Sequence, residues 1–137
     1  MSKLGVGVVG VGLMGKRHAE NVRRAIPEAR LVAVADADAA RARSVAEELE
    51  IEHCYDNCEE LVSRKDIQAV VIVNPAKFHA EAIGVAASAG KHILCEKPLA
   101  LTMEDATAVR QAVERAGVLF QIGFMRRYDP PYADAKR

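Results

Sequence analysis

Short apolar segments alternate along the chain with longer segments in which apolar residues recur every three to four positions. The apolar segments are nearly continuous, which is typical of strands that are buried on both faces. The longer segments have the spacing of helices with one buried face. The pattern predicts strands at 4–10, 30–36, 53–55, 68–73, 91–95 and 118–122, and helical segments at 13–25, 38–49, 58–62, 78–89 and 102–116.

Cap residues support these boundaries. Thr102 is followed three residues later by Asp105, a capping-box pattern that begins a helix. Gly90 and Gly117 stand where two of the helices should stop. Strands that alternate with helices form a parallel sheet with helices on both faces. We therefore expect an α/β fold with a doubly wound parallel sheet, the dinucleotide-binding Rossmann fold.

Composition and charge narrow the range of partners. The chain has 137 residues, of which 50% are hydrophobic and 28% charged, as expected for one soluble globular domain. Lys and Arg together number 19, and so do Asp and Glu, so no net charge attracts nucleic acid or an anionic membrane. No apolar run approaches the roughly 20 residues of a membrane span. We expect neither nucleic acid nor a membrane as a partner.

Three cysteines bear on the compartment and on metal binding. The number of cysteines is odd, and the sequence has no recognisable secretion signal, which favours reduced thiols in the cytoplasm. The cysteines are Cys54, Cys58 and Cys95. His53 beside Cys54 and Cys58 could suggest a metal site, but no second Cys or His pair stands elsewhere at ligand spacing. We expect no bound metal.

The alternating pattern stops after Gly123. Residues 124–137 resemble a loop and the start of a helix that does not develop. We expect a dinucleotide-binding domain over residues 1–123 and a truncated connection to an absent substrate domain over 124–137. A frayed natural terminus is the alternative.

A glycine turn follows the first predicted strand. Gly10, Gly12 and Gly15 form a G-x-G-x-x-G pattern between a strand and a helix, the context in which the pattern indicates a dinucleotide. The first glycine permits a tight turn, the second lets a diphosphate approach the backbone, and the third lets helix and strand pack closely. The helix N-terminus then offers free N–H groups to the phosphates. The alternative is a glycine turn that binds nothing.

The second predicted strand ends at Asp36, 24 residues after Gly12. A carboxylate at this place accepts hydrogen bonds from ribose hydroxyls and repels a 2′-phosphate. NAD is therefore favoured over NADP as the cofactor. Arg41 could turn towards a phosphate, although we expect it to be a solvated residue on the exposed face of its helix.

Glu96, Lys97 and Pro98 follow the fifth predicted strand. The carboxyl ends of parallel strands are where open α/β sheets bind ligands. A lysine beside a nicotinamide can act as a general base and take a hydroxyl proton. The sequence by itself supports an exposed turn equally well.

Four segments resemble the Gfo/Idh/MocA oxidoreductases, and the last is most similar to inositol 2-dehydrogenases. These segments, which occur in order along the whole chain, are GVGLMGKRHAENV, VVIVNPAKFHAE, AGKHILCEKPLALT and QIGFMRRYDP. The resemblance departs from the usual family pattern at Asn74, where Thr or Ser commonly precedes the proline.

The resemblance implies a role for particular residues. Lys97 would be the catalytic lysine, would also contact the substrate, and would precede a cis proline bond. Asp36 would hold the adenosine ribose, and Glu96 would contact the nicotinamide ribose. Arg127 would lie near the substrate. The other residues that would line the cofactor path are Gly10, Gly12, Leu13, Met14, Gly15, Asn74, Pro75, His79 and Met125. His79 could equally be an ordinary polar residue early in a helix.

The expected activity is NAD-dependent oxidation of a secondary alcohol in a cyclic polyol or sugar. Family members carry a second α/β domain that supplies an Asp and a His to the proton relay, and nothing in this sequence matches it. We therefore expect the chain to be inactive alone and to self-associate through the surface that the missing domain would cover. The alternatives are a free-standing dinucleotide-binding module or sensor, and a structural protein whose glycine turn is vestigial.

Overall fold

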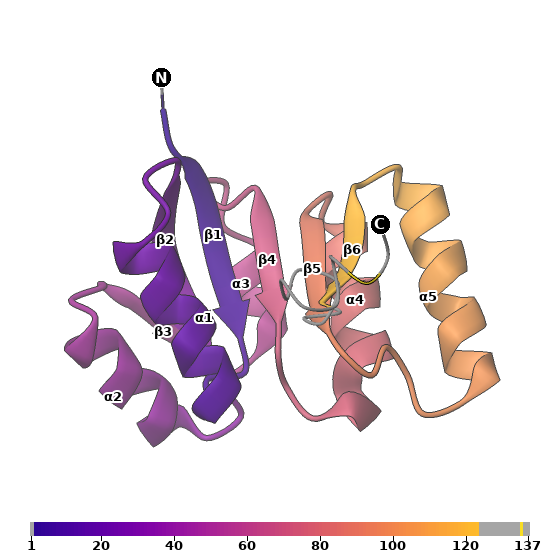
Figure 1. Ribbon diagram of the computed structural model, residues 1–137, viewed down its shortest axis with the longest axis horizontal. Coiled ribbons are helices and arrows are strands. Elements are labelled where there is room, and N and C mark those ends of the chain that lie inside the picture. Colours follow the sequence, from indigo (N-terminus) through magenta and orange to yellow (C-terminus); the bar gives the residue numbers. More distant parts are fainter. Residues whose placement is uncertain (1, 124–134, 136–137) are drawn as a thin grey trace.

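The computed structural model describes residues 2–123 and residue 135. Six parallel strands form one sheet in the order β3-β2-β1-β4-β5-β6 (Figure 1). The strands are β1 (Leu4–Val9), β2 (Ala29–Ala35), β3 (His53–Tyr55), β4 (Ala69–Ile72), β5 (His92–Glu96) and β6 (Phe120–Gly123). The doubly wound parallel sheet predicted from the alternating pattern is confirmed.

Helices cover both faces of this sheet. They are α1 (Leu13–Arg24), α2 (Ala39–Glu48), α3 (Cys58–Val62), α4 (His79–Ser88) and α5 (Met103–Ala116), with a 3₁₀ turn η1 (Ala76–Phe78) before α4. Apolar residues of α1 and α2 pack with one face of the sheet, and those of α3, α4 and α5 pack with the other. The strands β1, β2, β4 and β5 thus contribute side chains to two cores, which explains their nearly continuous apolar runs.

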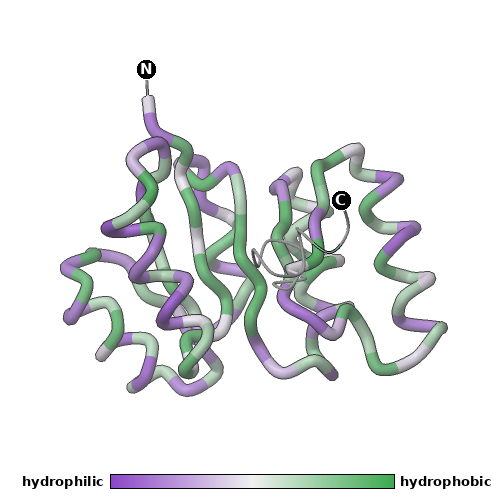
Figure 2. Tube along the Cα trace, in the orientation of Figure 1, coloured by the Kyte–Doolittle hydropathy of each residue, from purple (hydrophilic) through white to green (hydrophobic). Residues whose placement is uncertain are grey.

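The strand β4 illustrates this double burial. Val70 and Ile72 belong to the core under α3 and α4, whereas Val71, which lies between them, belongs to the core under α1 and α2. In Figure 2 the strands are mostly hydrophobic, while hydrophilic stretches follow the outer sides of the helices. Burial of the two cores is the main favourable contribution to folding.

The order of the strands places a crevice between β1 and β4. From β1 the chain passes outward to β2 and β3, and then returns to β4 on the other side of β1. The connections that leave β1 and β4 therefore diverge to opposite faces of the sheet. Such a reversal opens a crevice at the carboxyl ends of the two strands, the place where open α/β sheets bind ligands.

The predicted elements exist, with small differences at their ends. Thr102 caps α5 by accepting the N–H of Asp105 at 3.0 Å, and Gly117 ends it with φ 68°. The last strand begins at Phe120 rather than at residue 118, because its pairing with β5 starts there. The segment at 78–89 begins as η1 and becomes α-helical at His79.

In the part of the chain that the structure describes, no helix is both long and apolar enough to cross a membrane. Within the same residues, no group of three or more His, Cys, Asp and Glu side chains is arranged to hold a metal ion.

Candidate functional site

The glycine turn between β1 and α1 is shaped for a close backbone approach. Gly10 has φ +90°, and a Cβ there would lie 2.5 Å from the backbone nitrogen of Asn74. A Cβ on Gly15 would collide with the carbonyl oxygen of Gly10. Around Gly12, in contrast, a Cβ would meet nothing within 4 Å. Two glycines are thus required by the fold itself, and the third leaves open space in front of the helix.

The N-terminus of α1 faces this open space without a capping side chain. Gly12 is the N-cap, and the first turn holds no acidic residue. The side chain of Leu13 is 91% exposed and that of Met14 45% exposed, so neither covers the turn. The N–H groups in the first turn of a helix have no partner within the helix, and the helix dipole adds positive potential. The turn can therefore receive an anion.

Asp36 links the glycine turn to the turn that follows β2. It follows β2, and its side chain is only 10% exposed. Its Oδ2 accepts the backbone N–H of Val11 at 2.9 Å, and its Oδ1 accepts that of Asp38 at 2.9 Å. A carboxylate oxygen accepts more than one hydrogen bond, so both oxygens keep capacity for a ligand hydroxyl.

Arg41 lies closer to the site than the sequence suggested. Its side chain is 51% exposed, as expected on an outer helix face, but its Nη1 lies 3.6 Å from Asp36 Oδ1 and its Nη2 lies 3.8 Å from Asp38 Oδ2. The expected exposure on the outer helix face is confirmed. The side chain also lies near two carboxylates, because α2 begins directly after Asp38 and Arg41 is in its first turn.

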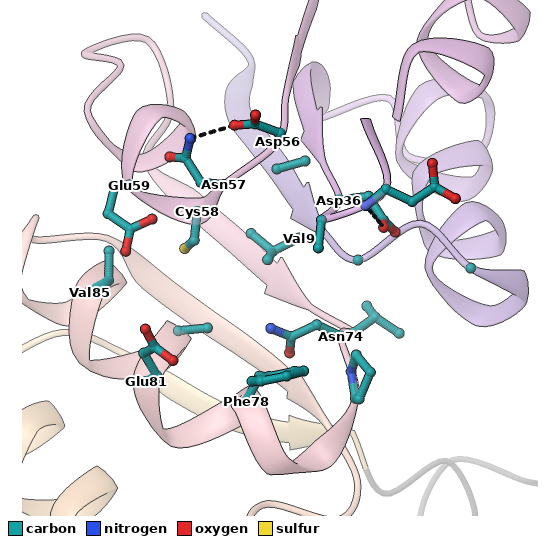
Figure 3. A pocket seen from close by; sticks show the side chains of 18 of the residues that line it. Val9, Asp36, Asp56, Asn57, Cys58, Glu59, Asn74, Phe78, Glu81 and Val85 are labelled. Carbon is teal, nitrogen blue, oxygen red and sulfur yellow. Dashed lines mark hydrogen bonds between the residues drawn. The ribbon is translucent and has the colours of Figure 1, made fainter. Parts of the chain in front are cut away.

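An open cavity of about 670 Å³ extends from the glycine turn between the ends of β1, β2, β3 and β4. Figure 3 shows Asp36, Asn57 and Phe78 arranged around it. The predicted site residues in its wall are Gly10, Gly12, Asp36, Asn74 and Pro75. Wall residues that sequence reasoning did not identify as site residues include Asp56, Asn57, Cys58, Glu59, Phe78 and Glu81. The only signal for them was their position after β3 or β4, at the carboxyl edge of the sheet.

Asn74 carries a buried polar atom without a partner. Its Oδ1 is enclosed, and no donor among the described residues contacts it. A buried carbonyl without a hydrogen bond is costly, and such an atom in a cavity wall is often satisfied by a ligand or water. The departure from the usual family residue at this position therefore leaves hydrogen-bonding capacity in the site.

Cys58 lies in the part of the cavity wall that α3 contributes. Burial raises the pKa of its thiol to about 11, and the nearby Glu59 and Glu81 carboxylates add to the rise. The thiol is therefore protonated near neutral pH, which makes it a poor nucleophile and a poor metal ligand.

Glu96 and Lys97 form a second cluster at the end of β5. Glu96 Oε1 lies 2.7 Å from His18 Nε2 of α1, and Glu96 Oε2 accepts the backbone N–H of Lys97 at 3.3 Å. Lys97 is exposed, and the peptide bond between it and Pro98 is cis, as the resemblance implied. Within residues 2–123, nothing hydrogen-bonds its ammonium group.

His79 lies behind the site rather than in its wall. The ring is 2% exposed. Its Nε2 lies 2.7 Å from the carbonyl oxygen of Asn74, and its Nδ1 lies 2.8 Å from that of Pro98. It therefore connects the two loops that follow β4 and β5. Met125 and Arg127, which sequence reasoning placed near the nicotinamide and the substrate, lie outside the described residues.

The arrangement provides an anion-binding turn, an anchored carboxylate and an exposed amine along one edge of the sheet. A linear ligand with a diphosphate centre and two polar ends suits this order. The open space at Gly12 and the unpartnered Asn74 Oδ1 are both consistent with such a ligand.

Comparison with known proteins supports NAD, the cofactor that the sequence favoured. Residues 4–124 match a family described as an oxidoreductase family with an NAD-binding Rossmann fold. The scyllo-inositol 2-dehydrogenase (NAD(+)) of Bacillus subtilis strain 168 is 45% identical over 130 residues, which cover 95% of this chain and 38% of that protein. An inositol 2-dehydrogenase of Rubrobacter xylanophilus is 44% identical over 98% of this chain and 39% of its own length.

Solved structures show the same fold. The scyllo-inositol dehydrogenase of Lactobacillus casei, solved with bound NAD(H) and scyllo-inositol, has a TM-score of 0.93 and 37% identity over 98% of this chain. The UDP-N-acetylglucosamine 3-dehydrogenase of Acidithiobacillus ferrooxidans has a TM-score of 0.89 and 32% identity. The chain spans about 40% of the length of these relatives. Because the family match covers nearly the whole sequence, the chain belongs to the oxidoreductase family with an NAD-binding Rossmann fold.

Proposed function

We propose that residues 1–123 are the NAD-binding domain of a dehydrogenase that oxidises a secondary alcohol of a cyclic polyol or sugar. Residues 124–137 would connect this domain to a substrate domain. The observation that carries the proposal is the alignment of the glycine turn, Asp36 and Lys97 along one edge of the sheet. The names of the inositol dehydrogenase relatives support the substrate class.

The cofactor would lie along the carboxyl edge of the sheet. The N–H groups at Gly12, Leu13 and Met14 would face the diphosphate, with Gly10 and Gly15 keeping the turn tight. The oxygens of Asp36 would accept the adenosine ribose hydroxyls. The adenine would enter the cavity towards Phe78, which lines it.

The charge of the cavity wall favours NAD over NADP. The wall includes five carboxylates, from Asp36, Asp38, Asp56, Glu59 and Glu81, and one guanidinium, from Arg41. Arg41 is close to two of these carboxylates, which reduce the positive charge it offers to a phosphate. A 2′-phosphate would therefore meet a mostly negative wall.

At the other end of the crevice, Lys97 would take part in the reaction. Bound NAD supplies the acceptor for the hydride that leaves the substrate carbon. The neutral amine of Lys97 would accept the hydroxyl proton, so that the C–OH group becomes a C=O group and the amine becomes an ammonium. Glu96 would contact the nicotinamide ribose. Asn74, with its neighbour Pro75, would present its amide to the cofactor in the middle of the crevice.

The chain alone should be a poor catalyst. Lys97 is exposed, and no described residue orients its ammonium group. A general base needs a fixed position and a site from which water is excluded. In the relatives, more than half of the protein lies outside the matched region, and it would supply these conditions.

The remaining properties are proposals as well. Self-association is supported by β6, which is an edge strand of the sheet formed by the described residues, and by Leu119 beside it, which is 74% exposed. The free state of Cys54, Cys58 and Cys95 supports the cytoplasm. The zero net charge supports a small-molecule partner rather than nucleic acid.

Fluorescence titration of the 137-residue chain with NADH, in parallel with NADPH, tests the proposal. Binding of NADH in preference to NADPH is expected. Absence of binding to either would contradict the proposed function. Efficient reduction of NAD with scyllo-inositol or myo-inositol by this chain alone would show that no further domain is needed.

A further inference from the structure

The segment Glu96–Pro98 is anchored on both sides of Lys97 by a histidine. On one side, His18 Nε2 lies 2.7 Å from Glu96 Oε1. On the other, His79 Nδ1 lies 2.8 Å from the Pro98 carbonyl oxygen. Neither histidine is in the wall of the 670 Å³ cavity, which is the place proposed for the adenosine end of the cofactor. Contact with the adenosine end of a cofactor therefore does not account for them.

The two histidines come from elements that form the walls of the crevice. His18 is on α1, which begins directly after Gly12 of the glycine turn. His79 begins α4, and its Nε2 lies 2.7 Å from the carbonyl oxygen of Asn74. Asn74 in turn packs against Gly10, where an added Cβ would lie 2.5 Å from its nitrogen. Both sides of the crevice are thereby tied to the residues that flank Lys97.

These contacts are partly or fully shielded from water. The His79 ring is 2% exposed, and the side chains of His18 and Glu96 are 24% and 17% exposed. Hydrogen bonds shielded from water are stronger than exposed ones. A His79 ring that carries one proton can donate to only one of its two carbonyl neighbours, whereas a doubly protonated ring donates to both. The two contacts place the ring between the loops after β4 and β5.

We propose that His18 and His79 are positioning residues, which hold the segment Glu96–Pro98 against the crevice so that a diphosphate bound at the glycine turn directs the nicotinamide end of NAD towards Lys97. This inference rests on the proposed function. It assigns the two histidines to the nicotinamide end of the site, and it leaves the adenosine end to Asp36 and the cavity.

The test compares ADP, which lacks the nicotinamide end, with NADH. The affinities of both are measured for the wild-type chain, His18→Ala and His79→Leu, and for the conservative variants His18→Gln and His79→Gln, whose amides keep N–H donors. His53→Ala is the matched control, because His53 is a partly exposed histidine at the opposite edge of the sheet. Circular dichroism checks folding, and His18→Ala decides the outcome if His79→Leu does not fold.

The ratio of NADH affinity to ADP affinity is the decisive quantity. We expect it to fall about tenfold in His18→Ala and His79→Leu, to stay near the wild-type value in the glutamine variants, and to be unchanged in His53→Ala; tenfold corresponds to about 1.4 kcal/mol. Protection of Lys97 by NADH against trinitrobenzenesulfonate, mapped by mass spectrometry, should fall in the same two variants. A purely structural role would lower both affinities in parallel.

Three results would overturn the inference. These are an unchanged ratio in both disruptive variants, a parallel loss of NADH and ADP binding, and a wild-type chain that binds the two ligands equally. Failure of the wild-type chain to bind ADP would instead contradict the proposed function, which keeps the two failures distinguishable.

Discussion

The Oδ2 atom of Asp36 accepts the backbone N–H of Val11 at 2.9 Å, so the carboxylate that ends β2 also holds the glycine turn that follows β1. The two residues are 25 positions apart in the sequence. Parallel pairing of β1 with β2 brings their carboxyl ends together, with Val9 opposite Ala35. One side chain therefore links the turn proposed to bind the diphosphate to the place proposed for the ribose.

Replacement of Asp36 should weaken the binding of NADH and change the cofactor preference. In Asp36→Ala the Val11 N–H loses its acceptor, and so would the ribose hydroxyls in the proposed binding mode; a hydrogen bond to a charged group contributes about 1.5–3 kcal/mol. We expect a loss of NADH affinity of roughly tenfold to a hundredfold. NADPH affinity should rise relative to NADH, because Arg41 loses its partner at 3.6 Å and becomes available to a 2′-phosphate.

The double variant Asp36→Ala/Arg41→Ala is the control for this interpretation. It should lose the relative gain for NADPH while keeping the weakened binding of NADH. Isothermal titration with both cofactors measures the four affinities, and a gain that persists without Arg41 would contradict the argument.

Replacement of two glycines of this pattern by alanine should affect stability and cofactor binding differently. A Cβ at Gly12 meets no atom within 4 Å, so the only stability cost expected for Gly12→Ala is that alanine is a poorer N-cap than glycine. Gly12→Ala should therefore lower the unfolding free energy by no more than about 1 kcal/mol. It should still weaken NADH binding about tenfold or more, since the methyl group occupies the space of the diphosphate.

Gly15→Ala is the matched comparison. Its Cβ would collide with the carbonyl oxygen of Gly10, so the helix and the strand would have to separate. We expect a loss of roughly 1–3 kcal/mol in stability. Chemical denaturation of both variants checks the contrast, and equal stability losses would show that the turn is less tightly packed than described.

Lys97 should matter for turnover and not for folding. Its side chain is exposed and makes no described hydrogen bond, so Lys97→Met should leave the unfolding free energy unchanged within about 0.5 kcal/mol. In a complete enzyme with its substrate domain, the same change should lower kcat by a factor of about 10²–10⁴, the range of general acid–base catalysis. Thermal unfolding and steady-state kinetics measure the two effects. Full turnover by the Lys97→Met enzyme would show that another group is the general base.

Alkylation of Cys58 should be slow near neutral pH and should report on the cavity. Burial and two nearby carboxylates raise the pKa of its thiol to about 11, so the reactive thiolate is scarce at pH 7. The rate with iodoacetamide should rise with pH towards that value, and NADH should slow it because Cys58 lines the cavity. Cys95, which is fully buried, is the internal reference in the same mass spectrum.

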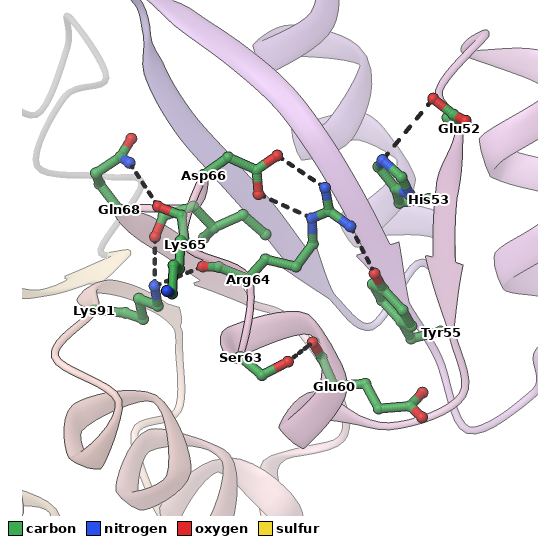
Figure 4. A network of polar contacts seen from close by, with 11 residues as sticks. Glu52, His53, Tyr55, Glu60, Ser63, Arg64, Lys65, Asp66, Gln68 and Lys91 are labelled. Atoms are coloured by element: carbon green, nitrogen blue, oxygen red, sulfur yellow. Dashed lines mark hydrogen bonds and ion pairs between the residues drawn. The ribbon is translucent and has the colours of Figure 1, made fainter.

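An ion pair just before β4, between Arg64 and Asp66, should make the stability of the fold depend on pH. Arg64 donates to both oxygens of Asp66, at 2.9 and 2.8 Å, and also to the hydroxyl of Tyr55 (Figure 4). The hydrogen bonds from Arg64 lower the pKa of Asp66 below its usual value of 3.8. The native state then binds fewer protons than the unfolded state, so this contribution is present above pH 3.8 and is lost as the pH falls through the lowered pKa.

Asp66→Asn should remove this dependence. The Asp66 side chain is 38% exposed, so the pair stabilises the fold by only about 0.5–1 kcal/mol at neutral pH. Urea unfolding at pH 7 and at pH 3 should show a smaller difference between the two pH values for the variant than for the wild type. Equal differences would mean that Asp66 is not the carboxylate that responds.

Much of the fold follows from patterns that are local in the sequence. The apolar runs predicted the central strands because a strand buried on both faces has no polar side. The caps of α5 are also local, since Thr102 and Gly117 each bond to a residue three or four positions away. The glycine turn and Asp36 were also found in this way, since each is defined by its place at the end of a strand.

Other features depend on contacts between distant segments, which no local pattern contains. The sequence by itself determined the strands, the glycine turn and the carboxylate at Asp36. Only the tertiary structure decided that His18 meets Glu96 across 78 positions, that His79 is buried between two carbonyls, and that the cavity wall includes Asp56 and Glu81. The physical reason is that hydrophobic periodicity specifies which face of each element is buried, whereas hydrogen bonds between polar side chains depend on how the elements are placed against one another.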